Sequence, residues 1–384
     1  RRGRCRPAAS PGRAAIAYIV PYETDTTAAM MMRLLQKGYR VNVANRPLNA
    51  GGRNYPSGTF VIRISRNPES IHDTIAQYSR EMGVNVSAVN TGYFDEGDTG
   101  VGGENVNALR QTKIAIAADD GITQESYGAI WWTLEKYGVK FTPMPFSNIA
   151  RGGLRNYNVL IIPSGNPGWI QAELGPGGVN AIKQFAQQGG TVVTMSGSAV
   201  WATLKDVGLT SSKMVGSEED EQKGKIPEDK PAASASPAPT PNDQMPEVGQ
   251  PLPPIASPSA DANKVPEALA GAMFRGTVDR TTYLNYGVSQ NEIPVLLQTG
   301  YFFRYSKEGT NAVVFDANPA RPLTISGFVW EGNTERLLKG TSYIMDESMG
   351  AGRVVLFAED PFYRGMTRST TRQFFNSILF NGIF

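Results

Sequence analysis

Short apolar runs alternate with amphipathic stretches through the first part of the chain. The apolar runs predict strands at 14–20, 41–44, 57–64 and 84–89. The stretches between them predict a helix within 26–40 that ends at Gly38, and a second helix over 67–83 that begins after Asn67 and is closed by Gly83. A strand, a helix and a strand in this order form a β-α-β unit, so we expect a parallel sheet in this part.

A second alternating series follows between residues 111 and 216. Apolar runs predict strands at 112–118, 140–144, 158–165 and 191–195. Helical spacing of apolar residues predicts helices over 124–138 and 177–190. Strands that alternate with helices of this length are typical of a parallel sheet with right-handed crossovers.

The pattern changes after residue 216. Charged residues and then Pro, Ala and Ser dominate 217–269, which predicts a disordered insertion because such a segment buries too little apolar surface to offset the entropy of ordering. The segment 271–384 is rich in strand patterns. It closes with a buried-strand pattern at 352–360 and an amphipathic helix after residue 366, and we expect this pair to return to the sheet of 111–215.

Composition and charge restrict the classes of protein to which the chain can belong. The 384 residues carry a net charge of +2, which argues against a generally basic nucleic-acid binder. Residues 1–13 combine several arginines with no acid. They could form a polybasic arm, but the Pro, Gly and Ala among them favour a disordered tail. The tail holds no apolar core of a signal peptide, and the chain holds no apolar run of about 18 residues, so we expect no membrane span.

The stretch "GGTVVTMSGSAVWATLKDVGL" (189–209) predicts a strand, a tight turn of small residues and a helix. Such a turn can present a nucleophile, here Ser196 or Ser198, over the edge of a sheet. A serine nucleophile usually needs a basic partner, and no histidine follows it. A catalytic serine–lysine pair with Lys183 or Lys205 is left open, although no SxxK spacing occurs at this turn.

Metal and cofactor chemistry finds little support in the sequence. Cys5 is the only cysteine and His72 the only histidine, so we expect neither a disulfide framework nor a hydrolytic zinc site. Carboxylates at Asp95, Glu96 and Asp98 lack the full calcium-loop pattern, and two glycine-rich segments lack the features of phosphate-binding loops. We expect no cofactor. Aromatic residues at 127, 131 and 132 on one predicted helix favour core packing over a ligand platform.

Several segments resemble the region that follows the catalytic domain in large bacterial zinc carboxypeptidases of the metallocarboxypeptidase family. These segments are "LLQKGYRVNVA", "YPSGTFVI", "YGAIWWTLEKYGVKFTPM", "LIIPSGNPGW", "IKQFAQQGGTVVTMSGSAVWATLKDVGL" and "GRVVLFAEDPFYRGMTRSTTRQFFNSILFN". The resemblance extends over nearly all of 14–384 except the insertion. The zinc-binding HxxE motif of that family's peptidase domain has no match in this sequence. The resemblance therefore assigns no catalytic residue to this chain. The resemblance implies an accessory role beside a peptidase domain or chain, and a periplasmic or secreted location.

Residues 111–215 also resemble class I glutamine amidotransferase-like domains, in which a strand, a turn and a helix hold a nucleophilic cysteine. In that comparison Ser196 occupies the cysteine position, and the family's downstream histidine has no counterpart. The predicted fold is therefore α/β, with two parallel-sheet α/β modules, at 14–110 and 111–216. The second is flavodoxin-like or amidotransferase-like, and the last strand and helix of the β-rich 271–384 segment complete it.

Three hypotheses about function follow. The first is a non-catalytic accessory part of a zinc carboxypeptidase-like protein. The second is an independent module that binds a small molecule or peptide at the strand ends, where doubly wound sheets usually bind ligands. Its expected site comprises Ser164, Gly165, Ser196 and Gly197. The third is a serine hydrolase that uses Ser196, which the missing histidine disfavours.

Overall fold

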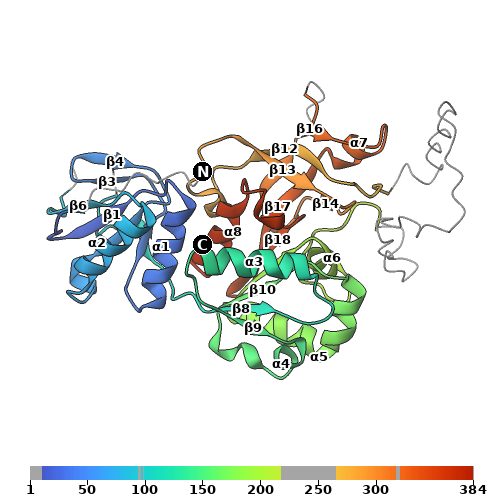
Figure 1. Cartoon of the computed structure of the whole chain (residues 1–384), viewed down its shortest axis with the longest axis horizontal. Helices are drawn as coiled ribbons and strands as arrows, with labels where there is room; N and C mark the ends of the chain where they lie inside the picture. Colours follow the sequence, from blue (N-terminus) through green and yellow to red (C-terminus); the bar gives the residue numbers. More distant parts are fainter. Residues whose placement is uncertain (1–10, 94–96, 98, 218–264, 317–320, 384) are drawn as a thin grey trace, which may run out of the picture.

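The computed structural model describes residues 11–93, 97, 99–217, 265–316 and 321–383. Most of the expected basic tail, most of the expected insertion and the carboxylates Asp95, Glu96 and Asp98 lie outside these ranges. The described chain forms a small five-stranded sheet in its first part and a large mixed sheet in the remainder (Figure 1). Among the helices of these ranges, none has the length and apolar character that crossing a bilayer requires.

The first sheet has the strand order β6-β1-β5-β2-β7, and all four of its strand pairs are antiparallel. The prediction of a parallel sheet in this module is therefore wrong. Two β-α-β crossovers are interleaved, so that β5 lies between the strands joined by α1 and β1 lies between those joined by α2. The elements are β1 (Ala17–Val20), α1 (Asp25–Gln36), β2 (Asn42–Ala44), β5 (Phe60–Arg63), α2 (Ile71–Met82), β6 (Ser87–Val89) and β7 (Val106–Ala108).

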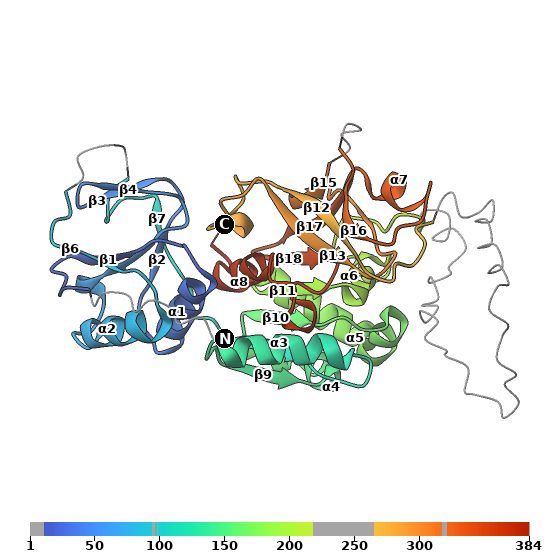
Figure 2. The same ribbon diagram turned by 45° about the horizontal axis from the view of Figure 1, so that its top comes forward.

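Both faces of this sheet are covered. Helices α1 and α2 lie against one face, and the hairpin of β3 (Leu48–Ala50) and β4 (Arg53–Tyr55) lies on the other (Figure 2). In β1, Tyr18 and Val20 belong to the main core on the helical side, while Ala17 and Ile19 pack with Leu48 and Tyr55 of the hairpin. Burial on both faces explains why these strands are continuously apolar and do not alternate.

The large sheet joins a parallel half to an antiparallel half. Its order is β13-β12-β15-β17-β18-β11-β10-β8-β9, with β14 beside β17 and β16 beside β12. Neighbouring strands from β18 to β9 are parallel, and those from β13 to β18 are antiparallel. The strands are β8 (Ile114–Ala117), β9 (Phe141–Met144), β10 (Val159–Ile162), β11 (Thr191–Met195), β12 (Ala272–Val278), β13 (Glu292–Leu297), β14 (Phe303–Arg304), β15 (Thr310–Phe315), β16 (Thr324–Gly327), β17 (Thr341–Met349) and β18 (Gly352–Phe357).

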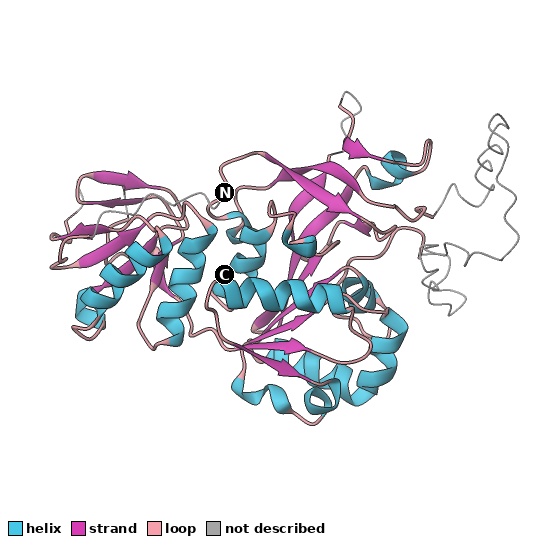
Figure 3. Ribbon diagram, in the orientation of Figure 1, coloured by secondary structure: helices cyan, strands magenta, loops and turns pink. Residues whose placement is uncertain are grey.

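Helices gather around the parallel half, while the part from β12 to β17 is mainly strand and loop (Figure 3). The helices are α3 (Gln124–Lys136), α4 (Phe146–Ala150), α5 (Pro167–Gln187), α6 (Gly197–Thr203), α7 (Thr334–Leu338) and α8 (Thr371–Leu379). Helix α5 begins ten residues before the predicted 177 and bends where Gly175 adopts φ 57° and ψ −177° ahead of Pro176. On α3, Tyr127 packs against the main core, which confirms the expectation for this residue. Trp131 and Trp132 are each 45 % exposed, so for them the expectation of core packing is wrong.

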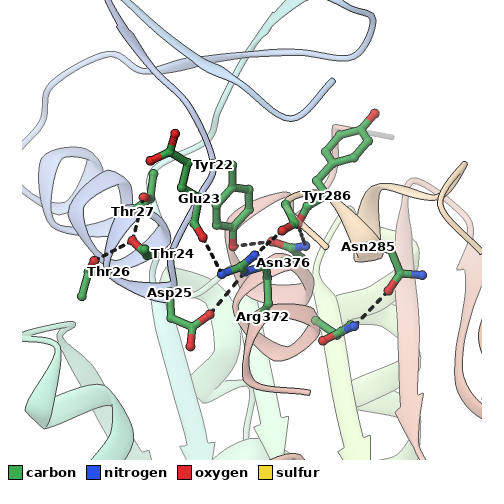
Figure 4. Close-up of polar contacts among 12 residues, drawn as sticks. Tyr22, Glu23, Thr24, Asp25, Thr26, Thr27, Asn285, Tyr286, Arg372 and Asn376 are labelled. Atoms are coloured by element: carbon green, nitrogen blue, oxygen red, sulfur yellow. Dashed lines mark hydrogen bonds and ion pairs between the residues drawn. The ribbon is translucent and has the colours of Figure 1, made fainter. Parts of the chain in front are cut away.

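Helix α8 attaches the first module to the large sheet (Figure 4). Asn376 accepts a hydrogen bond from the Tyr22 hydroxyl at 2.7 Å and donates to the carbonyl oxygens of Leu284 and Tyr286. Arg372 donates to the carbonyl oxygens of Glu23 and Gly287 and forms an ion pair with Asp25 at 3.3 Å. The C-terminal helix is thus shared by both parts of the molecule.

Candidate functional site: a cleft at the carboxyl ends of the parallel strands

A cleft of about 850 Å³ opens where three parallel strands end. Its walls come from the loops that follow β8, β10 and β11, together with Thr299 and Tyr301, which follow β13. The four residues that the sequence proposes as a ligand site, Ser164, Gly165, Ser196 and Gly197, all line this cleft. The fold brings them together because parallel strands place their carboxyl ends on one edge of the sheet.

The three loops approach each other so closely that glycine is required at two points. A Cβ atom on Gly197 would lie 1.9 Å from the carbonyl oxygen of Gly165. A Cβ atom on Gly165 would lie 2.3 Å from the carbonyl oxygen of Gly121. Backbone atoms cannot move aside as flexible side chains can. The closely packed backbone at Gly121, Gly165 and Gly197 therefore forms a rigid floor of the cleft.

Ser196 occupies a sharp bend between β11 and α6. Its φ of 49° and ψ of −119° lie in a region that side-chain-bearing residues rarely adopt. Its backbone N–H donates to the carbonyl oxygen of Phe357 on β18, and its carbonyl oxygen accepts from Val200. The bend therefore has the strained strand-to-helix geometry that was expected for 189–209.

The side chain of Ser196 lies beside the carboxyl group of Glu359, a residue that the sequence analysis did not select, and it lowers the pKa of that group. Glu359 follows β18 and is 3 % exposed, and its carboxylate accepts backbone N–H groups from Gln298 at 2.9 Å and Asp360 at 3.1 Å. Burial, followed by repulsion from Asp360, raises the pKa of Glu359 to about 7. The available signal was two acidic residues at the end of the predicted 352–360 strand, which was expected to return to the sheet of 111–215.

Asp360 connects to the cleft through two serines. The Ser126 hydroxyl on α3 donates to Asp360 Oδ1 at 2.6 Å and accepts the backbone N–H of Ser164 at 2.9 Å. Burial raises the pKa of Asp360 to about 6, although the hydrogen bond from Ser126 opposes this shift. Two carboxyl groups with raised pKa values therefore lie beneath the strand ends.

The groups that would serve a nucleophile at Ser196 are otherwise engaged. The N–H of Gly197, the position that usually stabilises an oxyanion, donates to the Ser164 hydroxyl at 3.3 Å. Ser198 is fully buried and donates to the carbonyl oxygen of Ile162 at 2.6 Å, so it fixes the turn. Within the described part of the chain, no hydrogen bond joins Ser196 to Lys183 or Lys205.

His72 lies far from the cleft in the fold, on α2 of the first module, and its Nδ1 is 2.8 Å from the Tyr18 hydroxyl. Across the described ranges, no three His, Cys, Asp or Glu side chains are placed so that they could share a metal ion.

Comparisons with known proteins yield only distant structural similarity. No protein-family model and no curated protein matches the chain. A putative ThuA-like protein from Bacteroides uniformis is 11 % identical, with a TM-score of 0.40 over 69 % of this chain and 89 % of that one. A cytoplasmic protein from Salmonella typhimurium is also 11 % identical, with a TM-score of 0.37 over 70 % of this chain and all of that one (100 %).

A β-galactosidase from Bacillus circulans is 12 % identical with a TM-score of 0.33, and the match covers 68 % of this chain but only 30 % of the galactosidase. At these TM-scores the similarity assigns no function. The α/β class, with its large mixed sheet, is established by the strand pairing described above.

Proposed function

We propose that this chain is a non-catalytic accessory part of a zinc carboxypeptidase-like protein and that it binds a ligand in the strand-end cleft. The proposal treats 111–216, completed by β18 and α8, as an amidotransferase-like domain that has kept the fold without the reaction. The sequence resemblance supports the peptidase context and the periplasmic or secreted location. The cleft supports the binding role.

The observation that carries the proposal is the occupied oxyanion position beside Ser196. A serine becomes a nucleophile when a base removes its proton and N–H groups face the developing oxyanion. A pKa of about 7 would suit Glu359 to act as a base near neutral pH, so the evidence against acyl transfer comes from the oxyanion side of the site. The N–H of Gly197 is directed to Ser164, and the Gly165 carbonyl oxygen packs against Gly197. An oxyanion would meet this carbonyl oxygen, so the arrangement favours binding over acyl transfer.

The lining of the cleft indicates the chemistry of a ligand. Hydroxyl and amide groups come from Thr123, Asn166 and Thr299, and the side chain of Trp169 is 48 % exposed. Asp120 is the charged residue among those that line the cleft in the described part of the chain. A polar ligand that is neutral or cationic, with an apolar surface for the indole ring, fits this lining. Peptides meet this description.

A cleft-filling variant tests the binding role. Ala172 lines the cleft on the exposed side of α5, so Ala172→Trp should fill it, while Glu173→Trp places the same bulk on the next exposed position, outside the lining. In titrations of the whole chain with a library of short neutral and lysine-containing peptides, we expect binding that Ala172→Trp removes and Glu173→Trp retains. Absence of binding, or equal effects of both variants, would contradict the binding role.

Separate measurements test the accessory role and the absence of catalysis. The reading frame upstream in the source genome should encode an HxxE-containing peptidase domain that co-purifies with this chain.

We expect the purified chain to hold no stoichiometric zinc, to cleave no carboxypeptidase substrate and to leave a fluorophosphonate probe unreacted. Labelling at Ser196 would instead support the serine-hydrolase alternative. Specific peptide binding without a peptidase partner would support an independent binding module.

A further inference from the structure

A groove of about 980 Å³ lies between the first module and the antiparallel half of the large sheet. The first module lines it with residues within 22–57, and the rest of the chain lines it with residues within 280–294 and 368–372. Figure 4 shows Tyr22 and Tyr286 of this lining beside the contacts that attach α8 to the first module. Those contacts fix the two walls of the groove relative to each other.

One wall of the groove is an outer edge of the large sheet. Within the described ranges, β13 ends the strand order and pairs with β12 alone, and its residues 292–294 line the groove. The N–H of Val278 donates to the carbonyl oxygen of Asn291. By the alternation of an antiparallel ladder, the N–H and C=O of Glu292 therefore point away from β12. An edge of this kind can pair with an extended peptide.

Two exposed arginines flank this edge. Arg280 follows the end of β12 by two residues, near the start of β13, and no hydrogen bond or ion pair within the described ranges engages its guanidinium group. Arg368 lies farther along β13, because its neighbour Ser369 donates to the carbonyl oxygen of Pro294. Only Nε of Arg368 is engaged among the described residues, as a donor to the Gly365 carbonyl oxygen at 3.3 Å. Both arginines can therefore bind an anionic group.

The acidic residues of the lining already have partners. Asp25 forms the ion pair described above. Glu292 accepts two hydrogen bonds from Arg321, at 2.6 and 3.1 Å, and Glu23 accepts one from the Asn85 side chain at 2.9 Å. The groove thus combines unpaired cationic groups with a strand edge that has backbone groups to offer.

We propose that this groove binds an extended acidic peptide segment, which adds a strand beside β13 and places its carboxylates against Arg280 and Arg368. Main-chain pairing at Glu292 supplies the alignment, and the arginines select acidic side chains. Burial, followed by repulsion from Arg368, lowers the pKa of Lys136, so the potential at this end of the groove is positive. A cationic peptide is repelled here, whereas the strand-end cleft suits neutral and cationic ligands.

Anisotropy titrations of the full chain with fluorescein-labelled, amidated hexapeptides test the groove. The probes are three valine–glutamate repeats, three valine–lysine repeats, three valine–glutamine repeats, and an N-methylated valine–glutamate peptide that keeps the charges but lacks backbone donors. Citrate serves as a competitor with three carboxylates and no peptide backbone. We expect the valine–glutamate peptide to bind roughly tenfold or more tightly than every other probe and to slow amide hydrogen exchange at Glu292.

Charge-reversal variants locate the binding. Arg280→Glu and Arg368→Glu should each weaken binding of the valine–glutamate peptide roughly tenfold or more and strengthen binding of the valine–lysine peptide. Both side chains are exposed, so near-ultraviolet circular dichroism should show a native fold. Arg151→Glu makes the same charge change at an exposed position after α4, outside the groove lining, and should leave binding unchanged.

Failure of the valine–glutamate peptide to bind would overturn the proposal. Equal affinity for the lysine or glutamine peptide, or an equal loss in Arg151→Glu, would refute selection by the two arginines. Equal affinity for the N-methylated peptide or for citrate would refute strand addition at β13. The variants lie outside the strand-end cleft, so this proposal and the binding role of that cleft can fail separately.

Discussion

The glycine floor of the cleft gives the sharpest test of the fold, through the substitution Gly197→Ala. The added methyl group would lie 1.9 Å from the Gly165 carbonyl oxygen, far inside van der Waals contact, and only backbone movement can relieve the clash. Overpacking of this kind costs about 1–3 kcal/mol, and a backbone obstacle places the cost at the upper end. Alanine is favoured over glycine within helices by about 0.5–1 kcal/mol, which offsets little at the first residue of α6. We expect a net loss of about 2–3 kcal/mol.

A matched substitution on α3 separates the clash from the helical preference. A Cβ atom on Gly128 would meet no atom within 4 Å, so Gly128→Ala should stabilise the protein by about 0.5–1 kcal/mol. Urea unfolding followed by circular dichroism measures both free energies of unfolding, with equal m-values as a check on the transition. If Gly197→Ala is as stable as the unchanged protein, the close approach of the loops after β10 and β11 is refuted.

Two other substitutions test the buried acid and the attachment of the first module. The folded-state pKa of Glu359 is raised, so its stabilising contribution is complete below the ordinary glutamate pKa and is lost as the pH rises toward about 7. Glu359→Gln should therefore flatten the fall in the free energy of unfolding between about pH 4.5 and 7, and an unchanged pH profile would contradict the shift. Arg372→Ala should cost about 1–3 kcal/mol and speed amide exchange near Tyr22, because two carbonyl oxygens and Asp25 lose their donor. Arg321→Ala breaks only the exposed pair with Glu292, and we expect it to cost less than about 1 kcal/mol; equal effects of the two arginine variants would refute the attachment role.

The sequence was most informative where the local signal is strong. Apolar runs located the strands from β8 to β11, and the glycine at 83 closes α2 with φ 65° as a helix C-cap does. The four candidate ligand residues lie together because each pair follows a strand of the parallel half, and strand direction can be inferred from alternation with helices.

The order of strands and the partners distant along the chain have no comparable signal in the sequence. Helix α5 extends through Gly175 and Pro176, which resemble a turn locally, because packing against the sheet holds both halves of a bent helix. Glu359 became part of the site only when β18 paired with β11 and brought the carboxyl group under Ser196.

The sequence alone thus determined the α/β class, the second series of parallel strands and the bend at Ser196, since each follows from periodicity and small residues within a short segment. The tertiary structure decided that the first sheet is antiparallel, because the periodicity of a strand is the same whichever neighbour it acquires. It also decided that carboxyl groups, and no histidine, lie beneath the bend. Pairing and burial join residues more than a hundred positions apart, and these contacts set both the pKa of Glu359 and the chemistry of the cleft.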